Sequence, residues 1–266
     1  MRPTTKLRAG EQLYLHHPPE TEPEVDDRIE VLWECDGVIA VYKPAGLPMH
    51  QVGAYHKNTF TSLVHDRVGH EWSAVHRLDL ETSGIVLCAN SPELRTALTE
   101  LWSKRAVQKT YVAIVRGVPG EDVWECREPI GDAVGSSIRI KGWVHPAGQT
   151  AHTRFRVLEV SADNDGRSFS LIAATPVTGR RNQIRIHAAF AGHVIVGDKL
   201  FHPDEQVFQE YFVNGNTDNV IRQVEHSRLC LHATRLNFVH PVSGEPCQVD
   251  ASIPDDMLEF WRGVSI

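Results

Sequence analysis

Residues 76–84 carry several reactive side chains on one short segment between two apolar runs. Arg77, Asp79, Thr82 and Ser83 supply a cation, a carboxylate and two hydroxyls. A polar turn of this kind can hold the Asp79 carboxylate against a substrate as a nucleophile. In a simpler interpretation, the Asp and Thr side chains only accept hydrogen bonds from nearby backbone N–H groups. Taken alone, the segment favours that simpler interpretation.

Common catalytic motifs do not account for this segment. Ser83, His76 and Asp79 have the residue types of a hydrolase triad, but they share one turn and the sequence has no G-x-S-x-G. The run Glu81-Thr82-Ser83-Gly84 has a glutamate where an aspartic protease has its aspartate, and it occurs once. There is also no P-loop and no G-x-G-x-x-G, so the sequence does not support chemistry with a nucleotide cofactor.

A second polar group lies at 178–187, where Arg180, Arg181 and Arg185 follow a glycine at the expected start of a helix. Guanidinium groups beside the free N–H groups of a helix start suit a phosphate or a carboxylate. A solvent-facing basic turn explains this segment about equally well. Tyr111 lies in an apolar run, and by itself it is best explained as a core residue of a strand.

The elements expected around these residues interleave without regular βαβ spacing. Two β-rich runs joined at Asp36-Gly37 predict a hairpin, and Ser91 before Pro92 predicts a helix to about Lys104. Residues 73–89 are expected to form a strand, a polar turn and a second strand. Further strands are expected at 109–117, 152–160, 168–175, 231–239 and 246–251, and short helices at 183–192 and around 204–213. The pattern predicts an α+β fold around a mixed, largely antiparallel sheet.

Composition and charge narrow the class of protein. The 266 residues are 41% hydrophobic, and no apolar run approaches the roughly 18 residues of a membrane span. With no secretory signal at the N-terminus, we expect a soluble, cytoplasmic protein that acts as a monomer. Five scattered cysteines without C-x-x-C, and histidines without H-E-x-x-H, suggest neither a disulfide framework nor a metal site.

The net charge of −7 argues against a uniformly basic nucleic-acid binder, but positive charge gathers in segments 95–116 and 180–199. If these two segments fold together, they form a local cationic groove. Two ordinary solvated faces are the alternative.

Five segments occur together in one order: KPAGLPMH, HRLDLETSGIVLCA, QKTYVAIVRG, TGRRNQIRIHAAFAGHVIVGDKLF and LHATRLNFVHP. In this order and spacing they closely resemble the RluA-type RNA pseudouridine synthases, and HRLD-x-x-TSG is specific for that family. The resemblance covers about residues 29–260. It implies the pseudouridine synthase fold and an enzyme that flips uridines out of structured RNA, ribosomal or transfer RNA, and isomerises them. The reaction needs no metal, redox agent or phosphate donor, so no cofactor is expected.

The resemblance also implies roles for individual residues. Asp79 matches the catalytic aspartate, and Arg185 matches the arginine that pairs with it, which we expect to be a charge-assisted hydrogen bond. Tyr111 matches the tyrosine that stacks on the target base and takes part in proton transfer. The expected substrate contacts are Arg77, which enters the RNA stack, Ile184 near the base, and Arg180, Lys43 and Thr82.

The sequence departs from the family in two places. Arg181-Asn182 replaces a more usual Thr-His or Ser-His, which affects the surroundings of the site but leaves Arg180 and Arg185 in place. The second departure is at the N-terminus, where residues 1–28 are too few for the S4-type RNA-binding domain that many members carry. They are expected to be the last strand of an S4-like element followed by an acidic linker, and 29–266 the catalytic domain. Two other functions are compatible with these residues: a non-catalytic RNA-binding protein with this fold, and a metal-independent hydrolase that uses Asp79.

Overall fold

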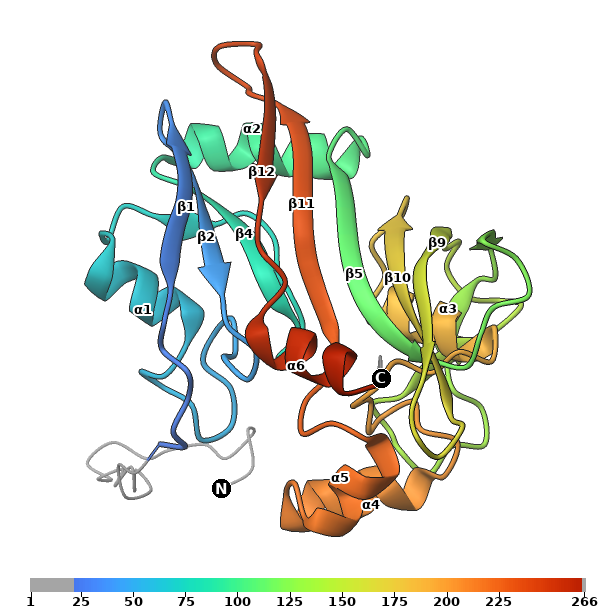
Figure 1. The fold of residues 1–266 in the computed structure, drawn as a ribbon. Helices are drawn as coiled ribbons and strands as arrows, with labels where there is room; N and C mark the ends of the chain where they lie inside the picture. The colour runs from blue at the N-terminus through green and yellow to red at the C-terminus, as the bar shows by residue number, and fades with distance from the viewer. Residues whose placement is uncertain (1–21, 265–266) are drawn as a thin grey trace, which may run out of the picture.

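The structure is a computed structural model that describes residues 22–264. The strand expected from the S4-like element therefore lies outside the described residues. The described strands are β1 (Glu30–Cys35), β2 (Val38–Lys43), β3 (Ser73–Ala74), β4 (Ser83–Ala89), β5 (Gln108–Arg116), β6 (Val123–Cys126), β7 (Ile130–Asp132), β8 (Gly142–Val144), β9 (Thr153–Ala162), β10 (Ser168–Pro176), β11 (Leu231–Val239) and β12 (Pro246–Asp250). The helices are α1 (Phe60–Arg67), α2 (Pro92–Ser103), α3 (Gln183–Phe190), α4 (Glu205–Asn214), α5 (Asp218–Val224) and α6 (Asp255–Gly263) (Figure 1).

One sheet organises the molecule. It has ten strands in the order β1-β2-β4-β11-β5-β10-β9-β6, with β12 beside β11 and β3 beside β4. The β4–β11 pair is parallel and the other pairs are antiparallel. Strands β7 and β8 pair separately. The predicted α+β fold with a mixed, largely antiparallel sheet is confirmed.

Strand β2 is apolar at successive positions because it is buried on both faces. Ile39 and Val41 lie in a core cluster with the apolar residues of α1, whereas Val38 and Ala40 lie in a second cluster with Leu98 of α2. Successive side chains of a strand point to opposite faces, so this division follows from the period of two. The hairpin at Asp36-Gly37 is confirmed, with positive φ angles of 41° and 80° at the two turn residues.

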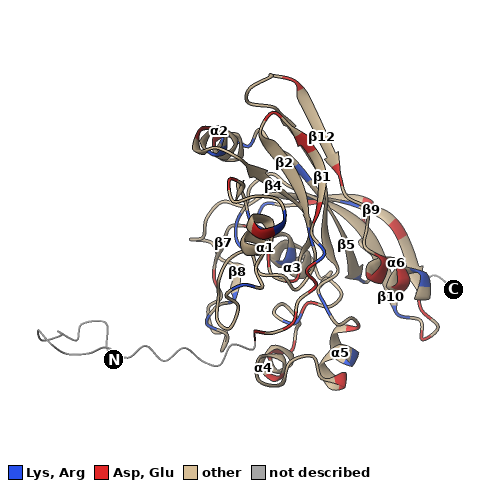
Figure 2. Cartoon of the chain, turned by 90° about the vertical axis from the view of Figure 1, so that its left-hand side faces the viewer, with Lys and Arg blue, Asp and Glu red and all other residues tan. Residues whose placement is uncertain are grey.

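Helices α3 and α6 lie on opposite sides of the sheet (Figures 1 and 2). Ile184 and Ala188 of α3 and Met257 and Trp261 of α6 belong to one core cluster with residues of β5 and β10. None of the helices between residues 22 and 264 is long and apolar enough to cross a membrane.

Most of the expected elements are present, and the differences concern short ones. The Ser91 side chain caps α2 by accepting a hydrogen bond from Leu94 N at 3.2 Å, as predicted. The helix expected around 204–213 is confirmed as α4. Helices α1, α5 and α6 and strands β6, β7 and β8 were not predicted. All six span fewer than ten residues, and elements this short depend more on tertiary packing than on local propensity.

The strand expected before the Asp79 loop is reduced to the two residues of β3. After Ala74 the chain leaves the sheet, and Val75 N donates to Leu87 O at 2.8 Å. The His76 ring then takes the place of a strand backbone, because its Nε2 accepts the hydrogen bond of Leu87 N at 3.1 Å. A side chain thus satisfies the β4 backbone, and the following residues are free to form the loop.

The middle of the sheet brings two parts of the expected site together. Gly84 is the register partner of Ala233 across the parallel β4–β11 pair, and Ala233 is the partner of Tyr111 across β11–β5. Gly84 has a φ of 119°, and a Cβ there would clash with the backbone of Ala233. Glycine is therefore required for this close approach, which sets the loop before β4 next to Tyr111.

Candidate active site

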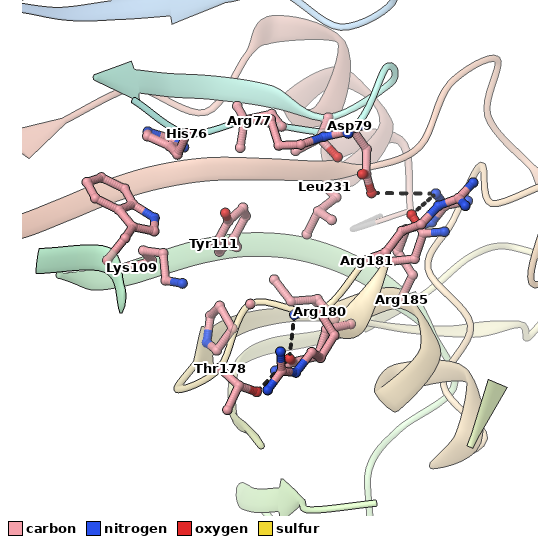
Figure 3. A pocket seen from close by; sticks show the side chains of 18 of the residues that line it. His76, Arg77, Asp79, Lys109, Tyr111, Thr178, Arg180, Arg181, Arg185 and Leu231 are labelled. Atoms are coloured by element: carbon pink, nitrogen blue, oxygen red, sulfur yellow. Dashed lines mark hydrogen bonds and ion pairs between the residues drawn. The ribbon is translucent and has the colours of Figure 1, made fainter. Parts of the chain in front are cut away.

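A cavity of about 430 Å³ opens between the loop before β4, the strand β5 and the segment before α3 (Figure 3). Small-molecule sites usually have volumes of roughly 300–1,000 Å³. The lining contains these expected site residues: Arg77, Asp79, Thr82, Tyr111, Arg180, Ile184 and Arg185. Lys43 is the expected site residue that does not line it.

The Asp79 loop is held by its backbone, which leaves its side chains available. Thr82 N donates to the backbone oxygen of Asp79 at 3.1 Å, and Gly46 N donates to Leu80 O at 2.9 Å. The Thr82 hydroxyl is buried and finds no hydrogen-bond partner among the described residues. The Asp79 side chain is 29% exposed and lies beside Arg185. These contacts do not support the simpler interpretation, in which the Asp79 and Thr82 side chains serve the turn.

Ser83 and His76 are engaged elsewhere. The Ser83 hydroxyl forms a hydrogen bond with Nδ1 of His232 at 2.9 Å, and its residue is 1% exposed. The His76 ring accepts from Leu87 N and stacks on Trp102 with ring centroids 4.5 Å apart. Burial lowers the pKa of His76 to about 3, so the ring is neutral. The triad alternative therefore has no support in this geometry.

Arg185 is bound mainly to a residue that the sequence did not single out. Its Nε and one terminal nitrogen each donate to Asp198 at 2.7 Å, which makes a two-pronged charge-assisted pair. The other terminal nitrogen donates to Asn182 Oδ1 at 3.2 Å and lies 3.7 Å from Asp79 Oδ2. The expected hydrogen bond between Arg185 and Asp79 is thus an ion pair at a longer distance, because Asp198 occupies the guanidinium fork.

Tyr111 lies between the two ends of the pocket, with Lys109 toward one end and Asp79 and Arg185 toward the other (Figure 3). Burial raises the pKa of the Tyr111 hydroxyl, and the negative charge of Asp79 raises it further. The phenol therefore stays protonated. Ile184, 7% exposed, adds an apolar contact to the same lining.

Lys43 is placed behind the loop rather than in the cavity. Its side chain is fully buried, and Nζ donates to Pro44 O at 2.9 Å and to Leu80 O at 3.1 Å. Burial lowers the pKa of Lys43 to about 7, and the charge of Asp79 opposes that shift. These contacts hold the Asp79 loop in position, so the structure gives no support to the expected direct contact of Lys43 with the substrate.

The expected cationic groove is formed in part. Lys109, Arg180 and Arg181 line the pocket together with the exposed Arg77. Arg116 and Lys199 do not contribute: Arg116 Nε is bound to Glu225 at 2.7 Å and Lys199 Nζ to Glu81 at 2.9 Å. Acidic partners on neighbouring elements neutralise these two cations. A count of the charged residues in each segment could not predict this pairing.

Gln183 organises the segment before α3, and the sequence analysis gave it no role. Its Oε1 accepts from Thr178 Oγ1 at 2.6 Å and Arg180 N at 3.0 Å, and its Nε2 donates to Thr153 Oγ1 at 2.9 Å. The preceding Asn182 has a left-handed φ of 53° and makes no side-chain cap. In the sequence the available signal was the position of Gln183 directly after a polar turn, at the start of the expected helix; in the structure the residue is 3% exposed. No group of His, Cys, Asp or Glu residues that could hold a metal ion occurs within 22–264.

Comparison with known proteins identifies the family of the chain. Residues 37–190, more than half of the chain, match the family described as RNA pseudouridylate synthase. The chain belongs to this family. As an RNA pseudouridine synthase it is an isomerase that acts on RNA, which confirms the activity implied by the sequence resemblance.

Individual pseudouridine synthases show how far the likeness extends. Ribosomal large subunit pseudouridine synthase D of Xanthomonas campestris pv. campestris is 33% identical over 99% of this chain and 78% of its own length. Ribosomal large subunit pseudouridine synthase C of Escherichia coli O157:H7 is 30% identical over 97% of this chain and 80% of its own length. Human RNA Pseudouridylate Synthase Domain Containing 1 shares the fold, with a TM-score of 0.68 and 21% identity over 87% of this chain and 86% of that one.

Proposed function

We propose that this pseudouridine synthase isomerises uridine in ribosomal RNA of the large subunit, with Asp79 as the nucleophile. The names of the two bacterial relatives support the choice of ribosomal over transfer RNA. We further propose that it works as a monomer in the cytoplasm without a metal or a nucleotide cofactor.

The position of the Asp79 carboxylate carries the proposal. It lines the cavity, is 29% exposed, and has the cation of Arg185 at 3.7 Å, while no described residue donates a hydrogen bond to it. A carboxylate that accepts no hydrogen bond from the protein keeps its lone pairs available for attack on a substrate. A binding module has no need of such a group, since it repels an anionic ligand.

The chemistry fits these residues. Isomerisation breaks the bond between N1 of uracil and C1′ of the sugar, turns the base and joins C5 to C1′. The proton on C5 is released and N1 gains a proton, so the product is an isomer of the substrate. Asp79 can serve by attack on C1′, by attack on C6 of the base, or by assisting a glycal intermediate. Tyr111 and Ile184 offer an aromatic and an apolar surface that keep the detached base in the pocket.

The target uridine must leave its stack to reach Asp79, which costs a few kcal/mol. Arg77 is exposed at the mouth of the pocket, two residues from Asp79, and its planar guanidinium can fill the space that the base leaves. Arg180 and Thr82 line the pocket as further contacts, Arg180 for phosphate and Thr82 through its unpartnered hydroxyl.

Asp79→Asn tests the proposal. Asparagine keeps the shape of the side chain but cannot act as a carboxylate nucleophile, so we expect no tritium release from RNA labelled at C5 of uridine. Because Arg185 retains Asp198, the free energy of unfolding should change by no more than about 1–2 kcal/mol. The exposed Asp66→Asn on α1 is the matched control. A single-turnover rate within about tenfold of wild type would contradict the role of Asp79, since it represents only ~1.4 kcal/mol of transition-state stabilisation.

The reaction product distinguishes a pseudouridine synthase from a hydrolase and from a non-catalytic RNA-binding protein. Wild-type enzyme should leave the mass of the RNA unchanged, whereas a hydrolase releases free base or cleaves the strand, and a binding protein releases no tritium. Mapping pseudouridine in total RNA with and without the gene identifies the substrate. Loss of a site in transfer RNA alone would show that the proposed ribosomal substrate is wrong.

A further inference from the structure

Asp198 and Lys199 are consecutive charged residues outside the pocket lining, and they are 1% and 2% exposed. The preceding Gly197 has a φ of 81°, and a Cβ there would clash with the backbone oxygen of Arg228. Glycine at this position lets the chain pass close to the segment before β11. Buried charges are costly unless they are paired, so the partners of these two residues indicate what they are for.

Asp198 fixes Arg185. It accepts two hydrogen bonds from the guanidinium at 2.7 Å, and its Oδ1 also accepts from Phe201 N at 3.0 Å. The Phe201 ring lies under the guanidinium at 5.0 Å, and Asn182 holds the remaining nitrogen. Arg185 is therefore held from several sides, and all these groups belong to α3 or the segments next to it.

Lys199 fixes the other side of the site. Its Nζ donates to both carboxylate oxygens of Glu81, at 2.9 and 3.2 Å, and to Ser227 O at 2.6 Å. Glu81 is two residues from Asp79 on the same loop, and it also accepts from Tyr211 of α4 at 3.2 Å and from Leu229 N at 3.1 Å. The loop is thereby tied to the segment that also holds Arg185.

We infer that Asp198 and Lys199 are a pair of positioning residues that together set the separation of Asp79 and Arg185. Asp198 engages the fork of Arg185, and Lys199 anchors the Asp79 loop through Glu81. Because the two are adjacent in the chain, a shift of one side of the site is transmitted to the other. This inference rests on the proposed function of Asp79.

The chemistry of the nucleophile explains why Asp198, and not Asp79, occupies the guanidinium fork of Arg185. A guanidinium fork that faced Asp79 directly would donate two strong hydrogen bonds and engage the lone pairs needed for attack. With Asp198 in the fork, Arg185 still supplies positive charge at 3.7 Å but leaves the carboxylate open to the substrate. Asp198 therefore acts through Arg185, and its removal should slow the chemical step more than it weakens RNA binding.

The test uses the full chain with Asp198→Asn and, in case that variant folds poorly, Asp198→Glu, which keeps the charge but displaces the oxygens. We expect single-turnover tritium release to fall about 100-fold for Asp198→Asn and about tenfold for Asp198→Glu, as displaced catalytic groups commonly do, with RNA Kd within about threefold of wild type. Asp163→Asn is the matched control, since Asp163 also binds an arginine, Arg167 at 2.8 Å, on the turn between β9 and β10. It should keep the wild-type rate.

A double-mutant cycle separates positioning from a general structural role. In an Arg185→Lys background, Asp198→Asn should slow the reaction by less than about threefold, because the residue through which it acts is already changed. A full 100-fold loss in that background, or a wild-type rate for Asp198→Asn, would overturn the inference. Thermal melting shows whether each variant is folded under the assay conditions. An inactive wild-type enzyme would instead count against the proposed function itself.

Discussion

Arg77 extends from the catalytic loop to the surface, where no described carboxylate forms an ion pair with it. We predict that Arg77→Ala impairs base flipping more than initial RNA docking, because Lys109, Arg180 and Arg181 still contact the phosphates. A fluorescent base analogue at the target position measures flipping, and a binding isotherm at fixed salt measures docking. Arg222→Ala, on α5, serves as the control. Normal amplitude and rate of flipping in Arg77→Ala would exclude this role.

Lys43 makes the stability of the protein depend on pH. Burial lowers its pKa from 10.5 to about 7, so between these values the unfolded chain holds a proton that the folded chain has lost. Stability from this group therefore rises with pH from about 7 to 10, by at most about 1.4 kcal/mol per pH unit, and is flat below 7, where both states are protonated.

Lys43→Met should remove this rise. We predict that the free energy of unfolding of wild type, relative to the variant, increases from pH 7 to pH 10 in urea titrations. Lys104→Met is the control, because the Lys104 side chain is 68% exposed. Parallel pH profiles for wild type and Lys43→Met would show that Lys43 keeps its ordinary pKa in the folded protein.

Among the strands, the close approach of β4 and β11 places the Asp79 loop next to Tyr111. Gly84→Ala introduces a Cβ against the backbone of Ala233 and strains a positive φ, whereas Gly166→Ala strains a φ of 78° with nothing within 4 Å. We predict that Gly84→Ala costs about 2 kcal/mol more in the free energy of unfolding than Gly166→Ala. It should also lower activity, since the Asp79 loop leads into β4. Equal losses of stability in urea unfolding would show that β4 and β11 can separate at no cost.

The elements themselves were largely predictable from the sequence. The hairpin at Asp36-Gly37, the capped helix at Ser91 and the long strands depend on turn chemistry, side-chain capping and a period of two, which are properties of neighbouring residues. Helix α6 was not predicted, because its N-cap residue, Pro254, makes no side-chain cap and the helix is stabilised by Met257 and Trp261 in the core.

The chain has a net charge of −7, so we expect it to bind a polyanion through a local group of cations. If Arg77, Lys109, Arg180 and Arg181 each neutralise a phosphate, the logarithm of the RNA association constant should fall against the logarithm of salt concentration with a slope of about −3. Arg181→Ala should reduce the size of that slope by about 0.7.

A filter-binding or anisotropy titration over a range of salt concentrations measures this slope. Arg262→Ala is the control, because Arg262 lies on α6, on the other side of the sheet from α3 (Figure 2). If both variants reduced the slope equally, the RNA would be bound by general attraction rather than by the pocket.

The family, the fold class and the chemical types at the site could all be predicted from the sequence. Asp79, Tyr111 and Arg185 could be named because their motifs and their order along the chain are specific, and the structure places all three around one cavity. These inferences succeed because they depend on residue identity and on local spacing.

How those residues are paired depends on the tertiary fold. Asp198 holds Arg185, Lys43 lies behind the loop, and Lys199 is neutralised by Glu81, which is 118 positions away in the sequence. Each pairing depends on the register of the sheet and on how the segments after α3 pack against it. A charged residue has many possible partners along a sequence, and only folding selects the one that lies within hydrogen-bond distance when both are buried.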